Sequence, residues 1–402
     1  MQSVNASRDR IQFRTTQSKR HAHASGLVTL LTLLFQFSTN SIADEAMKAF
    51  FGPPTHDRQR LYHDQRYPNV IVSNRGTVLS IWGNSGVVVR RSEDGGVSWM
   101  DPVIIAAKGY HSGGAIVDSH SGDILVFVED RQPPAPLTVY RSRDDGQSWH
   151  PEKTVIKADP NGHIPSMHMN EHGITLKHAP YNGRLIRASR YYGVKNGQEH
   201  WPDQYTNAVF SDDGGKTWQT SNPFPEQGTG EAALVELSDG RIYYNSRVHW
   251  PKRPNNRRRR EAWSNDGGAT WENWRIVDIL PDGDQGRPYG CMAGLTRIPS
   301  KKQDILIFSN LDTQASHRER ITVWASLDGG KTWPVKRLVD GERSGYSSLA
   351  SGLSGTPSAG WIYLLYEHDP FKGAHMSRFN LSWILEGQLT GNGTVPKLSN
   401  LE

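Results

Sequence analysis

Six side chains, spread over most of the chain, have the chemistry needed to hold an anion and to move a proton beside it. They are Arg66, Glu231, Arg247, Arg318, Tyr346 and Glu367. Guanidinium groups bind carboxylates through paired hydrogen bonds and keep their positive charge. A tyrosine hydroxyl has an ordinary pKa of about 10, so it becomes a nucleophile only when a neighbouring base takes its proton. Which of these residues meet depends on the elements that carry them.

A short polar segment with the pattern Ser-x-Asp-x-Gly-x-x-Trp, called the box below, occurs five times. It begins at Ser92, Ser142, Ser211, Ser264 and Ser326, so successive starts are 50, 69, 53 and 62 residues apart. Periods of this length are typical of solenoids and propellers. A strand-like run precedes each box, as at 86–91, and two more lie upstream, as at 69–73 and 77–82. Each repeat therefore predicts four antiparallel strands, the composition of one propeller blade.

The box itself has a structural explanation. Its Asp can accept backbone N–H groups of its own turn, its Gly supplies a positive φ, and its Ser closes the turn with a side-chain hydrogen bond. Its Trp is expected to pack between neighbouring blades, where a large ring buries much apolar surface. We therefore assign the box to the turn between the third and fourth strands and give it no catalytic role.

A sixth repeat lacks the box. Residues 345–353 and 360–367 predict its first two strands, and residues 374–384 predict its third strand and the segment after it. The 39 Gly, 23 Pro and 13 Trp among 402 residues also favour many short strands joined by turns. We expect one all-β domain over residues 44–402, a six-bladed β-propeller with five boxes.

Propeller geometry places the chemically capable residues on one face. Because strands alternate in direction, first strands begin, and second strands end, on the face opposite the boxes. The six residues occupy such places, either before or at the start of a first strand (Arg66, Glu231, Tyr346), at the end of a second strand (Arg247, Glu367), or in the loop after a second strand (Arg318). We expect all six to converge on one central cavity.

The chain resembles the exo-sialidase (neuraminidase) family over essentially all of residues 44–402. The resemblance rests on the five boxes, "RYP" (66–68), "GEAALVELSDGRIYYNSR" (230–247), "SHRERITVWASLDGGKTW" (316–333) and "GYSSLA…LLYE" (345–367). Boxes occur in other propellers, whereas the ordered set Arg, Glu, Arg, Arg, Tyr, Glu is far more specific. The resemblance implies a glycoside hydrolase, an exo-α-sialidase that removes terminal sialic acid or a related acidic sugar from glycoconjugates without a cofactor or metal.

The resemblance also implies a role for each residue. In that family three arginines bind the carboxylate of the sugar, which implies Arg66, Arg247 and Arg318. A tyrosine–glutamate pair forms the nucleophile, which implies Tyr346 and its base Glu231, and a late glutamate that braces the first arginine implies Glu367. Sialic acid carries a carboxylate on its anomeric carbon, which would repel an anionic nucleophile, whereas a tyrosine arrives neutral.

The expected acid is missing from its usual place. The family has an Asp acid/base between the second and third strands of the first blade, but here that loop is "GNSG" (83–86). The corresponding loop of the next blade, in "VEDRQPPAP" (128–136), faces the same side and is stiffened by prolines. Asp130 is therefore our candidate acid, with Glu129 and Asp64 as alternatives. A second function stays open, a carbohydrate-binding propeller that keeps the arginines but has lost turnover.

One motif competes with this interpretation. "HMNEH" (168–172) matches H-x-x-E-H, an inverted zinc-protease motif that requires a helix. Pro165 precedes the motif, Gly173 follows it, and the next residues are strand-like. We therefore expect no zinc site, and we place His163, His168 and His172 at the rim of the pocket.

The N-terminus predicts export. Basic residues at 8–20, an apolar run at 26–35 and the small residues Ser41 and Ala43 follow the order of a signal peptide. An uncleaved membrane anchor is the alternative, but the apolar run is short for a membrane span. We expect residues 1–43 to be removed, and the mature protein to be secreted or periplasmic with no stable membrane span.

Charge and cysteine content limit the partners. The chain has a net charge of +5, but residues 1–43 contain five basic residues and one acidic residue, which leaves +1 for the rest. This balance gives no reason to expect nucleic acid as a partner, and the arginine run 257–260 is expected to be a solvated loop. Cys291 is the only cysteine, so an internal disulfide is excluded. We expect a monomer whose partner is a sialylated glycan or another acidic sugar.

Overall fold

The computed structural model describes residues 47–111, 113–193, 202–250, 257–283, 290–300, 303–369 and 372–396. The chain separates into two units, Met1–Ile42 and Ala43–Glu402, and all described residues belong to the second. The predicted signal peptide, residues 1–43, lies outside the described residues. In the described part of the chain, no helix has both the length and the apolar character needed to cross a membrane.

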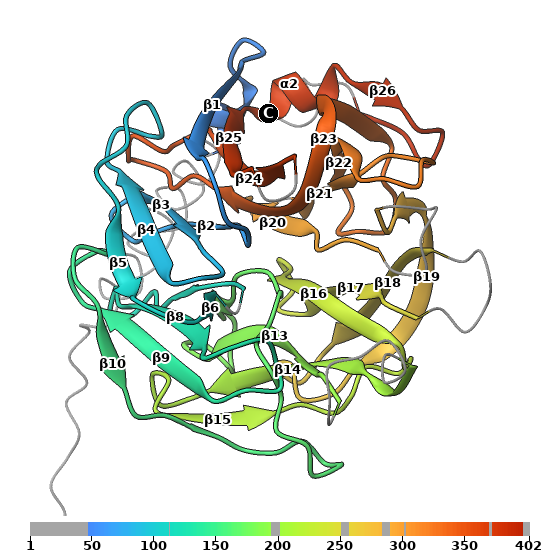
Figure 1. The fold of residues 1–402 in the computed structure, drawn as a ribbon. Helices are drawn as coiled ribbons and strands as arrows, with labels where there is room; N and C mark the ends of the chain where they lie inside the picture. The colour runs from blue at the N-terminus through green and yellow to red at the C-terminus, as the bar shows by residue number, and fades with distance from the viewer. Residues whose placement is uncertain are drawn as a thin grey trace, which may run out of the picture. The chain divides into compact units, whose positions relative to one another are not determined.

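The described strands form five sheets, and four of these have four or five strands each (Figure 1). The first contains β2 (Asn69–Val72), β3 (Val78–Trp82), β4 (Val87–Ser92) and β5 (Val103–Ala106). The second contains β6 (Tyr110–His111), β7 (Ile116–Val117), β8 (Ile124–Glu129), β9 (Leu137–Ser142) and β10 (His150–Glu152). The third contains β11 (Val155–Ile156), β12 (Ile174–Thr175), β13 (Leu185–Tyr191), β14 (Tyr205–Ser211) and β15 (Thr217–Thr220). The fourth contains β16 (Thr229–Glu236), β17 (Ile242–Val248), β18 (Arg258–Ser264) and β19 (Glu272–Pro281).

The remaining sheet has eight strands and is built around one long strand. It contains β20 (Gly294–Ile298), β21 (Ile305–Leu311), β22 (Glu319–Ser326), β23 (Val335–Ser351), β24 (Ile362–His368), β25 (Ala374–Phe379), β1 (His56–Tyr62) and β26 (Gln388–Leu389). The first half of β23, to Arg343, pairs with β22, whereas its second half, from Ser344, pairs with β24. Two short helices, η1 (Ala49–Phe51) and α2 (Leu381–Leu385), complete the described elements.

The sheets follow one another around an axis, so that the fold is all-β and propeller-like (Figure 1). Strands β2, β7, β13, β16, β20 and β23 contact one another in that order around the axis. Strand β23 also contacts β2, which brings the last sheet against the first. Strand β1, from the start of the described chain, pairs with β25 near its end. This pairing adds a strand that the sequence analysis did not predict.

The five boxes form turns with the same kind of hydrogen bonds. In the first, Ser92 Oγ accepts from Gly96 N at 2.7 Å, and Asp94 Oδ1 accepts from Val97 N and Ser98 N at 3.0 Å. The φ of Gly96 is +85°, a left-handed conformation that disfavours side chains. Corresponding bonds hold the turns at Asp144, Asp213, Asp266 and Asp328. Each turn joins the third and fourth strands of its repeat, as its sequence predicts.

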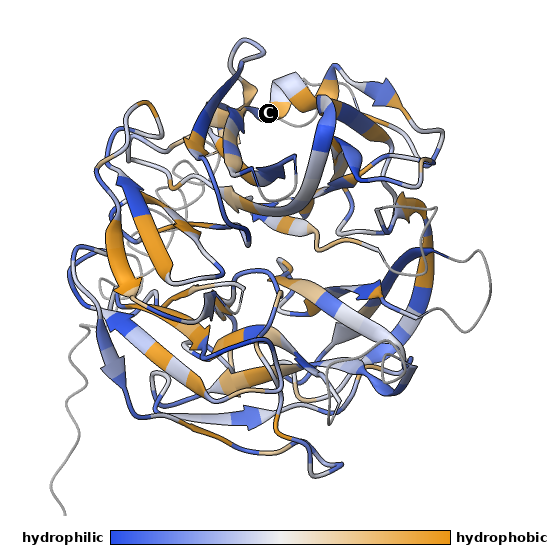
Figure 2. Cartoon of the chain, in the orientation of Figure 1, coloured by the Kyte–Doolittle hydropathy of each residue, from blue (hydrophilic) through white to orange (hydrophobic). Residues whose placement is uncertain are grey.

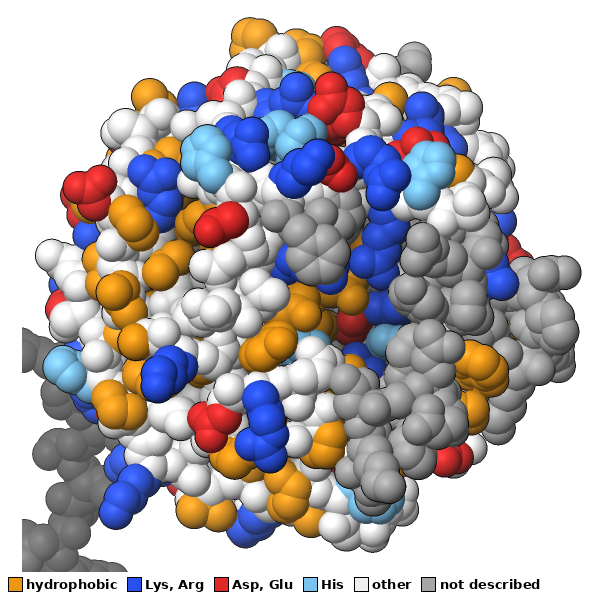
Figure 3. Space-filling model, in the orientation of Figure 1, with side chains coloured by type: hydrophobic (Ala, Val, Ile, Leu, Met, Phe, Trp, Pro, Cys, Tyr) orange, Lys and Arg blue, Asp and Glu red, His pale blue; other side chains and the backbone are white. Residues whose placement is uncertain are grey.

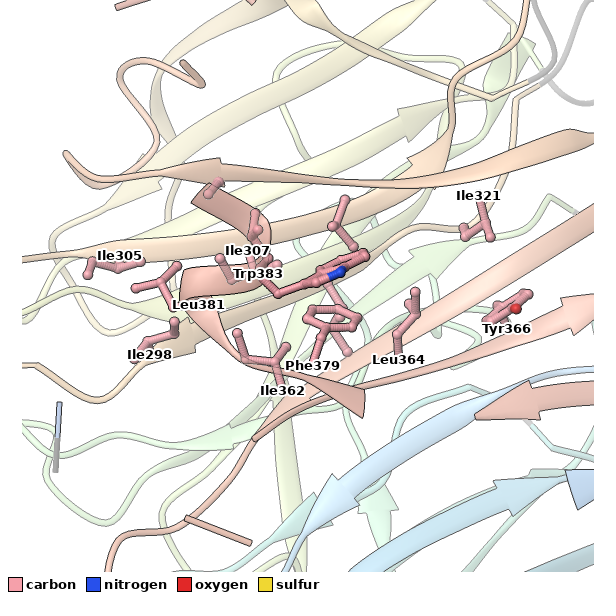
Figure 4. Close-up of a cluster of buried hydrophobic side chains, with 14 of the residues drawn as sticks. Ile298, Ile305, Ile307, Ile321, Ile362, Leu364, Tyr366, Phe379, Leu381 and Trp383 are labelled. Carbon is pink, nitrogen blue, oxygen red and sulfur yellow. The ribbon is translucent and has the colours of Figure 1, made fainter. Parts of the chain in front are cut away.

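The tryptophans of these turns belong to apolar clusters between adjacent sheets. Trp218, near the start of β15, is fully buried and meets Phe127 of β8 edge to face, with ring centroids 5.5 Å apart. The largest cluster lies between the two halves of the eight-stranded sheet, where Ile307, Leu364 and Trp383 pack together (Figure 4). Polar and apolar residues form bands along strands such as β9 (Figure 2). Strands such as β8, β14, β17 and β21 are buried at every residue, so both faces of these strands are covered.

The prediction of a solvated loop at residues 257–260 is wrong. Residues 258–260 belong to β18, and Arg259 and Arg260 are buried. Arg259 Nη1 donates to Asp282 Oδ1 at 2.8 Å, and Arg260 Nε donates to Glu226 Oε2 at 2.8 Å. The buried charges are paired with acids distant in the sequence, so the run of like charges gave no sign of its burial.

Candidate active site

Six of the predicted site residues come from different strands or strand ends on the face opposite the box turns. Glu231 is the third residue of β16, Arg247 lies near the end of β17 and Glu367 near the end of β24. Tyr346 lies in the second half of β23. Arg66 lies a few residues before β2, and Arg318 lies directly before β22. Figure 3 shows a hollow near the centre of one face, in which basic, acidic and histidine side chains lie close together.

Tyr346 and Glu231 are in direct contact. The Tyr346 hydroxyl donates to Glu231 Oε1 at 3.1 Å. The other carboxylate oxygen, Oε2, accepts from Arg247 Nη1, and the same nitrogen lies 3.4 Å from the Tyr346 oxygen. The side chains of all three residues are buried. The arrangement joins a phenol, a carboxylate and a guanidinium in one small cluster.

Glu367 holds Arg66 in place. Arg66 donates from Nε to Glu367 Oε1 at 2.7 Å and from Nη2 to Oε2 at 2.9 Å, a bidentate pair. Oε2 also accepts the backbone N–H of Tyr346 at 3.0 Å. Because Glu367 is fully buried, its carboxylate fixes Arg66 and the Tyr346 backbone relative to each other.

Two guanidinium groups flank the Tyr346 ring. The Cζ atoms of Arg66 and Arg318 lie 4.8 and 4.9 Å from the ring centroid. Arg318 Nη2 donates to the Gly290 carbonyl at 2.9 Å. With Arg247 at the hydroxyl, the three predicted arginines surround one phenol, and they form a cationic lining suited to a carboxylate ligand.

The electrostatics keep Tyr346 protonated. Burial raises the pKa of Tyr346, the negative charge of Glu231 raises it further, and Arg247, Arg318 and Arg66 oppose the rise. The hydroxyl is therefore neutral at rest, and Glu231 is the carboxylate that accepts its hydrogen bond. Burial opposes the charge on Arg66, but the carboxylate of Glu367 raises its pKa, so this guanidinium stays charged.

Known proteins with similar sequences include sialidases. The BNR repeat-like domain matches residues 174–356. A sialidase of Micromonospora viridifaciens is 29% identical over 396 residues, which cover 87% of this chain and 57% of that protein. The chain is similar to sialidases. The chain spans between 25% and 57% of the length of these curated relatives.

Solved structures show the same similarity. The Hadza microbial sialidase Hz136 superposes with a TM-score of 0.63 at 25% identity, over 80% of this chain and 66% of that one. The intramolecular trans-sialidase of Ruminococcus gnavus superposes with a TM-score of 0.60 at 14% identity, over 81% of this chain and 95% of that one. At that low identity the second match concerns the fold alone.

The seventh predicted residue, Asp130, lies apart from the cluster formed by the other six. It follows β8, its side chain is exposed, and its backbone N–H donates to the Pro136 carbonyl at 3.0 Å. Within the described residues, its carboxylate forms no hydrogen bond or ion pair with the other six. The alternative Glu129 is fully buried and accepts from Ser166 Oγ at 2.6 Å, whereas the other alternative, Asp64, is exposed.

The three predicted rim histidines lie in different surroundings. His168 meets the ring of Tyr67 edge-on at 5.5 Å, and Tyr67 stacks on Tyr346 at 6.2 Å, so His168 lies beside the cluster. His163 stacks on Tyr191 at 3.9 Å. The rim prediction is wrong for His172, which lines a cavity of about 280 Å³ at the ends of the inner strands, on the box side. The motif 168–172 forms no helix, and Met169 within it has a φ of +56°.

Sequence reasoning missed two neighbours of Glu231. Arg190 Nη1 and His249 Nε2 each lie 3.9 Å from Glu231 Oε1, and both residues are buried. Burial lowers the pKa of His249 well below its usual value, and the nearby arginines lower it further, so its imidazole is neutral. Arg190 lies near the end of the second strand of its repeat, the position already used to find Arg247 and Glu367. That rule, applied to every repeat, could have found it.

Proposed function

We propose that the protein is an exo-α-sialidase, a retaining glycoside hydrolase that releases a terminal sialic acid or related acidic sugar from a glycan. The observation that carries the proposal is the contact of Tyr346 with Glu231 inside a ring of three arginines. A phenol beside a carboxylate base suits attack on a carbon that bears its own carboxylate. The sialidase relatives support the same class of substrate.

The reaction would proceed in two displacements. Arg66, Arg247 and Arg318 bind the carboxylate of the sugar and orient its anomeric carbon over Tyr346. The Tyr346 oxygen bonds to that carbon and its proton passes to Glu231, while the bond to the leaving glycan breaks and the leaving oxygen takes a proton from an acid. Water then attacks the same carbon and gives a proton to the conjugate base of that acid, the bond to Tyr346 breaks, and Glu231 returns its proton to the phenolate. Two inversions retain the anomeric configuration.

The proposed fold behind this function is a six-bladed β-propeller with five Asp boxes, Asp box being the name of the box in that family. The eight-stranded sheet counts as two blades when β23 serves as the outer strand of one and the inner strand of the next. Strand β1 would then be the fourth strand of the last blade. This count gives each blade an inner strand at the axis, where all six site residues gather.

Asp130 remains the proposed acid. Its loop in the second sheet opens on the same face as the cluster, and the equivalent loop of the first sheet, residues 83–86, has no carboxylate. The exposure of Asp130 favours the second candidate function, a carbohydrate-binding propeller that retains the arginines without turnover. Cleavage assays separate the two candidates. A binding protein cleaves no substrate at all, whereas an enzyme with Asp130 as its acid cleaves substrates at rates that depend on their leaving groups.

The expected location is outside the cytoplasm. We propose that residues 1–43 direct export, and that the mature protein acts as a monomer on sialylated glycans in a secreted or periplasmic location. No part of this reaction requires a metal or an organic cofactor.

The function is tested by incubating purified protein with an aryl sialoside and with sialyllactose over a range of pH. The proposal expects release of sialic acid from both, retention of configuration in the first-formed product, and loss of both activities in Tyr346→Phe. Tyr110→Phe, a nearby tyrosine outside the proton-transfer pair, serves as a matched control that should keep activity. Binding of a sialoside without release by the wild-type protein would favour the binding propeller instead.

A further inference from the structure

The second strands of five repeats carry a polar residue at the same position. The sixth residue of β8, β13, β17, β21 and β24 is Glu129, Arg190, Arg247, Asn310 and Glu367, in that order. All five side chains are buried. Because equivalent positions in a propeller face the axis at the same height, this position supplies the site with some of its charged groups. Arg247 and Glu367 already belong to the candidate site, and Arg190 shares their position without an assigned role.

Arg190 is a fourth guanidinium at the reacting pair. Its side chain is 1% exposed, and its Nη1 lies 3.9 Å from Glu231 Oε1, the oxygen that accepts the proton of Tyr346. Its Nη2 donates to Gln204 Oε1, and its Cζ lies 4.4 Å from the Tyr192 ring centroid. Within the described residues, its Nε has no hydrogen-bond partner. The side chain is thus held by an amide and a ring rather than by a dedicated acid of its own.

Arg190 and Arg247 have different relations to a bound sugar. Arg247 pairs with Glu231 Oε2 and is also one of the three arginines proposed to take the substrate carboxylate. When that carboxylate arrives, it offsets the positive charge of Arg247, and Glu231 loses part of its compensation. Arg190, on β13, lies near the other carboxylate oxygen of Glu231. Its positive charge therefore continues to act on Glu231 when the substrate carboxylate is bound.

We propose that Arg190 is a positioning residue that keeps the Tyr346–Glu231 pair anionic and oriented while the substrate carboxylate occupies the arginine triad. The role rests on the proposed function and extends it. A positive charge about 4 Å from a carboxylate favours its ionised form. Glu231 therefore stays able to accept the phenol proton in the presence of an anionic substrate.

The other groups around Glu231 determine how the role is tested. Its carboxylate faces Tyr346 from β23, Arg247 from β17 and His249 just after β17, while Arg259 of β18 donates to its backbone oxygen at 3.4 Å. His168, which lies beside Tyr67, faces Arg190 and Arg66. The pKa values of both histidines are lowered by burial and by the arginines, so removing Arg190 also acts on them.

The test is the pH dependence of kcat/KM for an aryl sialoside in Arg190→Met, Arg190→Lys and the wild type. Without the positive charge beside the Tyr346–Glu231 pair, the acid limb of the Arg190→Met profile should move upward by about one unit or more. At pH values below the acid limb, the kcat/KM of Arg190→Met should be about tenfold lower than that of the wild type. At higher pH the loss should be smaller. Arg190→Lys retains the charge and keeps the limb near that of the wild type.

Two further comparisons separate this role from others. Arg141→Met removes a buried arginine that pairs with Asp123 and Glu152 on the box side, and it should cost stability without moving the limb. The shift should persist in a His249→Asn background, because the responding group is the Tyr346–Glu231 pair. Affinity for a carboxylate-bearing inhibitor above the limb should change less than about threefold, because Arg190 is not assigned to the carboxylate.

The outcomes are distinct. An active wild type with an unmoved acid limb in Arg190→Met contradicts the role and leaves the proposed function standing. A large loss of inhibitor affinity with an unmoved limb would make Arg190 a substrate-binding residue instead. If Arg190→Met does not fold, Gln204→Leu, which removes the amide that orients Arg190, must shift the limb in the same direction, or the role is wrong. An inactive wild type overturns the proposed function and this role together.

Discussion

Tyr346 is buried between a carboxylate and several guanidinium groups, and the two kinds of charge act on its hydroxyl in opposite directions. Burial and Glu231 hold the proton on, while Arg247, Arg318 and Arg66 favour its loss. A neutral phenol can approach a carbon that carries a carboxylate, and the same arginines then stabilise the charge that develops as the proton leaves. The residue types at this site therefore form a consistent set for an acidic sugar.

Replacing Arg318 by Ala should weaken substrate binding. Arg318 lies over the Tyr346 ring, where its guanidinium is placed to meet a carboxylate directed at the anomeric position. Loss of one such charged contact should raise KM strongly and weaken a carboxylate-bearing transition-state analogue by about 2–5 kcal/mol. Arg320→Ala is the matched control, because Arg320 is exposed and its Nε donates to the Asp312 carbonyl. Unchanged inhibitor affinity in Arg318→Ala would remove Arg318 from the site.

Replacing Asp130 by Ala should affect substrates according to their leaving groups. An aryl leaving group needs little protonation, whereas a sugar hydroxyl needs much. Asp130→Ala should therefore reduce cleavage of sialyllactose far more than cleavage of a nitrophenyl sialoside, as measured by kcat/KM for each. Asp64→Ala tests the exposed alternative in the same assay. Equal losses on both substrates, or none on either, would reject Asp130 as the acid.

The composition of the charged cluster could be predicted from sequence because its members sit at repeated positions. The pattern placed Glu231, Tyr346 and Arg247 on one face, and the contacts among them are present. The contact of His249 with Glu231 was not predictable. His249 follows the end of β17, where no repeated strand position determines the direction of its side chain. Arg190 was missed although its position is one of the repeated ones.

At the scale of the elements, the box turns explain how short strands hold a precise geometry. Each Asp is enclosed by hydroxyl and backbone N–H donors of its own turn. Burial acts to raise the pKa of Asp94, but the hydrogen bonds from Ser98, Ser92 and Val97 together outweigh burial and lower this pKa to about 2. The ionised carboxylate of Asp94 is therefore more stable in the folded protein than in the unfolded chain.

The turn carboxylates should make the fold sensitive to acid. Because the folded pKa of Asp94 is depressed, its stabilisation is present above the unfolded value of about 3.9 and is lost as pH falls toward about 2. In Asp94→Asn, the free energy of unfolding should fall less steeply between those pH values, as measured by urea melts at a series of pH. Asp101→Asn, an exposed carboxylate outside the turn, should leave the slope unchanged. Identical slopes in all three proteins would contradict this account of the turn.

The strands could be predicted where apolar residues repeat along the sequence. They were missed where charged residues replace the apolar residues of that pattern. Predicted runs at 69–73 and 77–82 correspond to β2 and β3. Strand β1 has the sequence HDRQRLY, whose polar residues pair with β25 at the edge of a sheet and so carry no apolar alternation. The start of β18 was hidden in the same way by arginines that meet acids only in the folded chain.

For the whole molecule, closure of the ring depends on the two ends of the described chain. Strand β1 pairs with β25 from His56 to Tyr62, and Tyr62 stacks on Trp82 of the first sheet at 5.2 Å. The same strand therefore belongs to the last sheet and touches the first. Strand β1 thus covers the edge of β25 and packs the last sheet against the first.

Deleting β1 should destabilise the whole propeller-like fold. A variant that begins at residue 63 loses the pairing with β25 and the buried side chain of Tyr62, whereas one that begins at Met47 keeps both. Loss of one large buried aromatic alone costs about 3–5 kcal/mol, so the shorter variant should unfold at a clearly lower temperature and lower urea concentration. Equal melting of the two variants would show that β1 does not close the ring.

The most direct test of the central claim is covalent trapping with a fluorinated sialosyl donor, followed by mass spectrometry of the digested protein. The fluorine slows breakdown of the intermediate, so the residue that attacks the anomeric carbon keeps the sugar. The account predicts one labelled residue, Tyr346, and no label in Glu231→Gln within the same time, because the phenol then lacks its base. A label on a different residue, or a product of inverted configuration, would contradict the assignment of Tyr346 as the nucleophile.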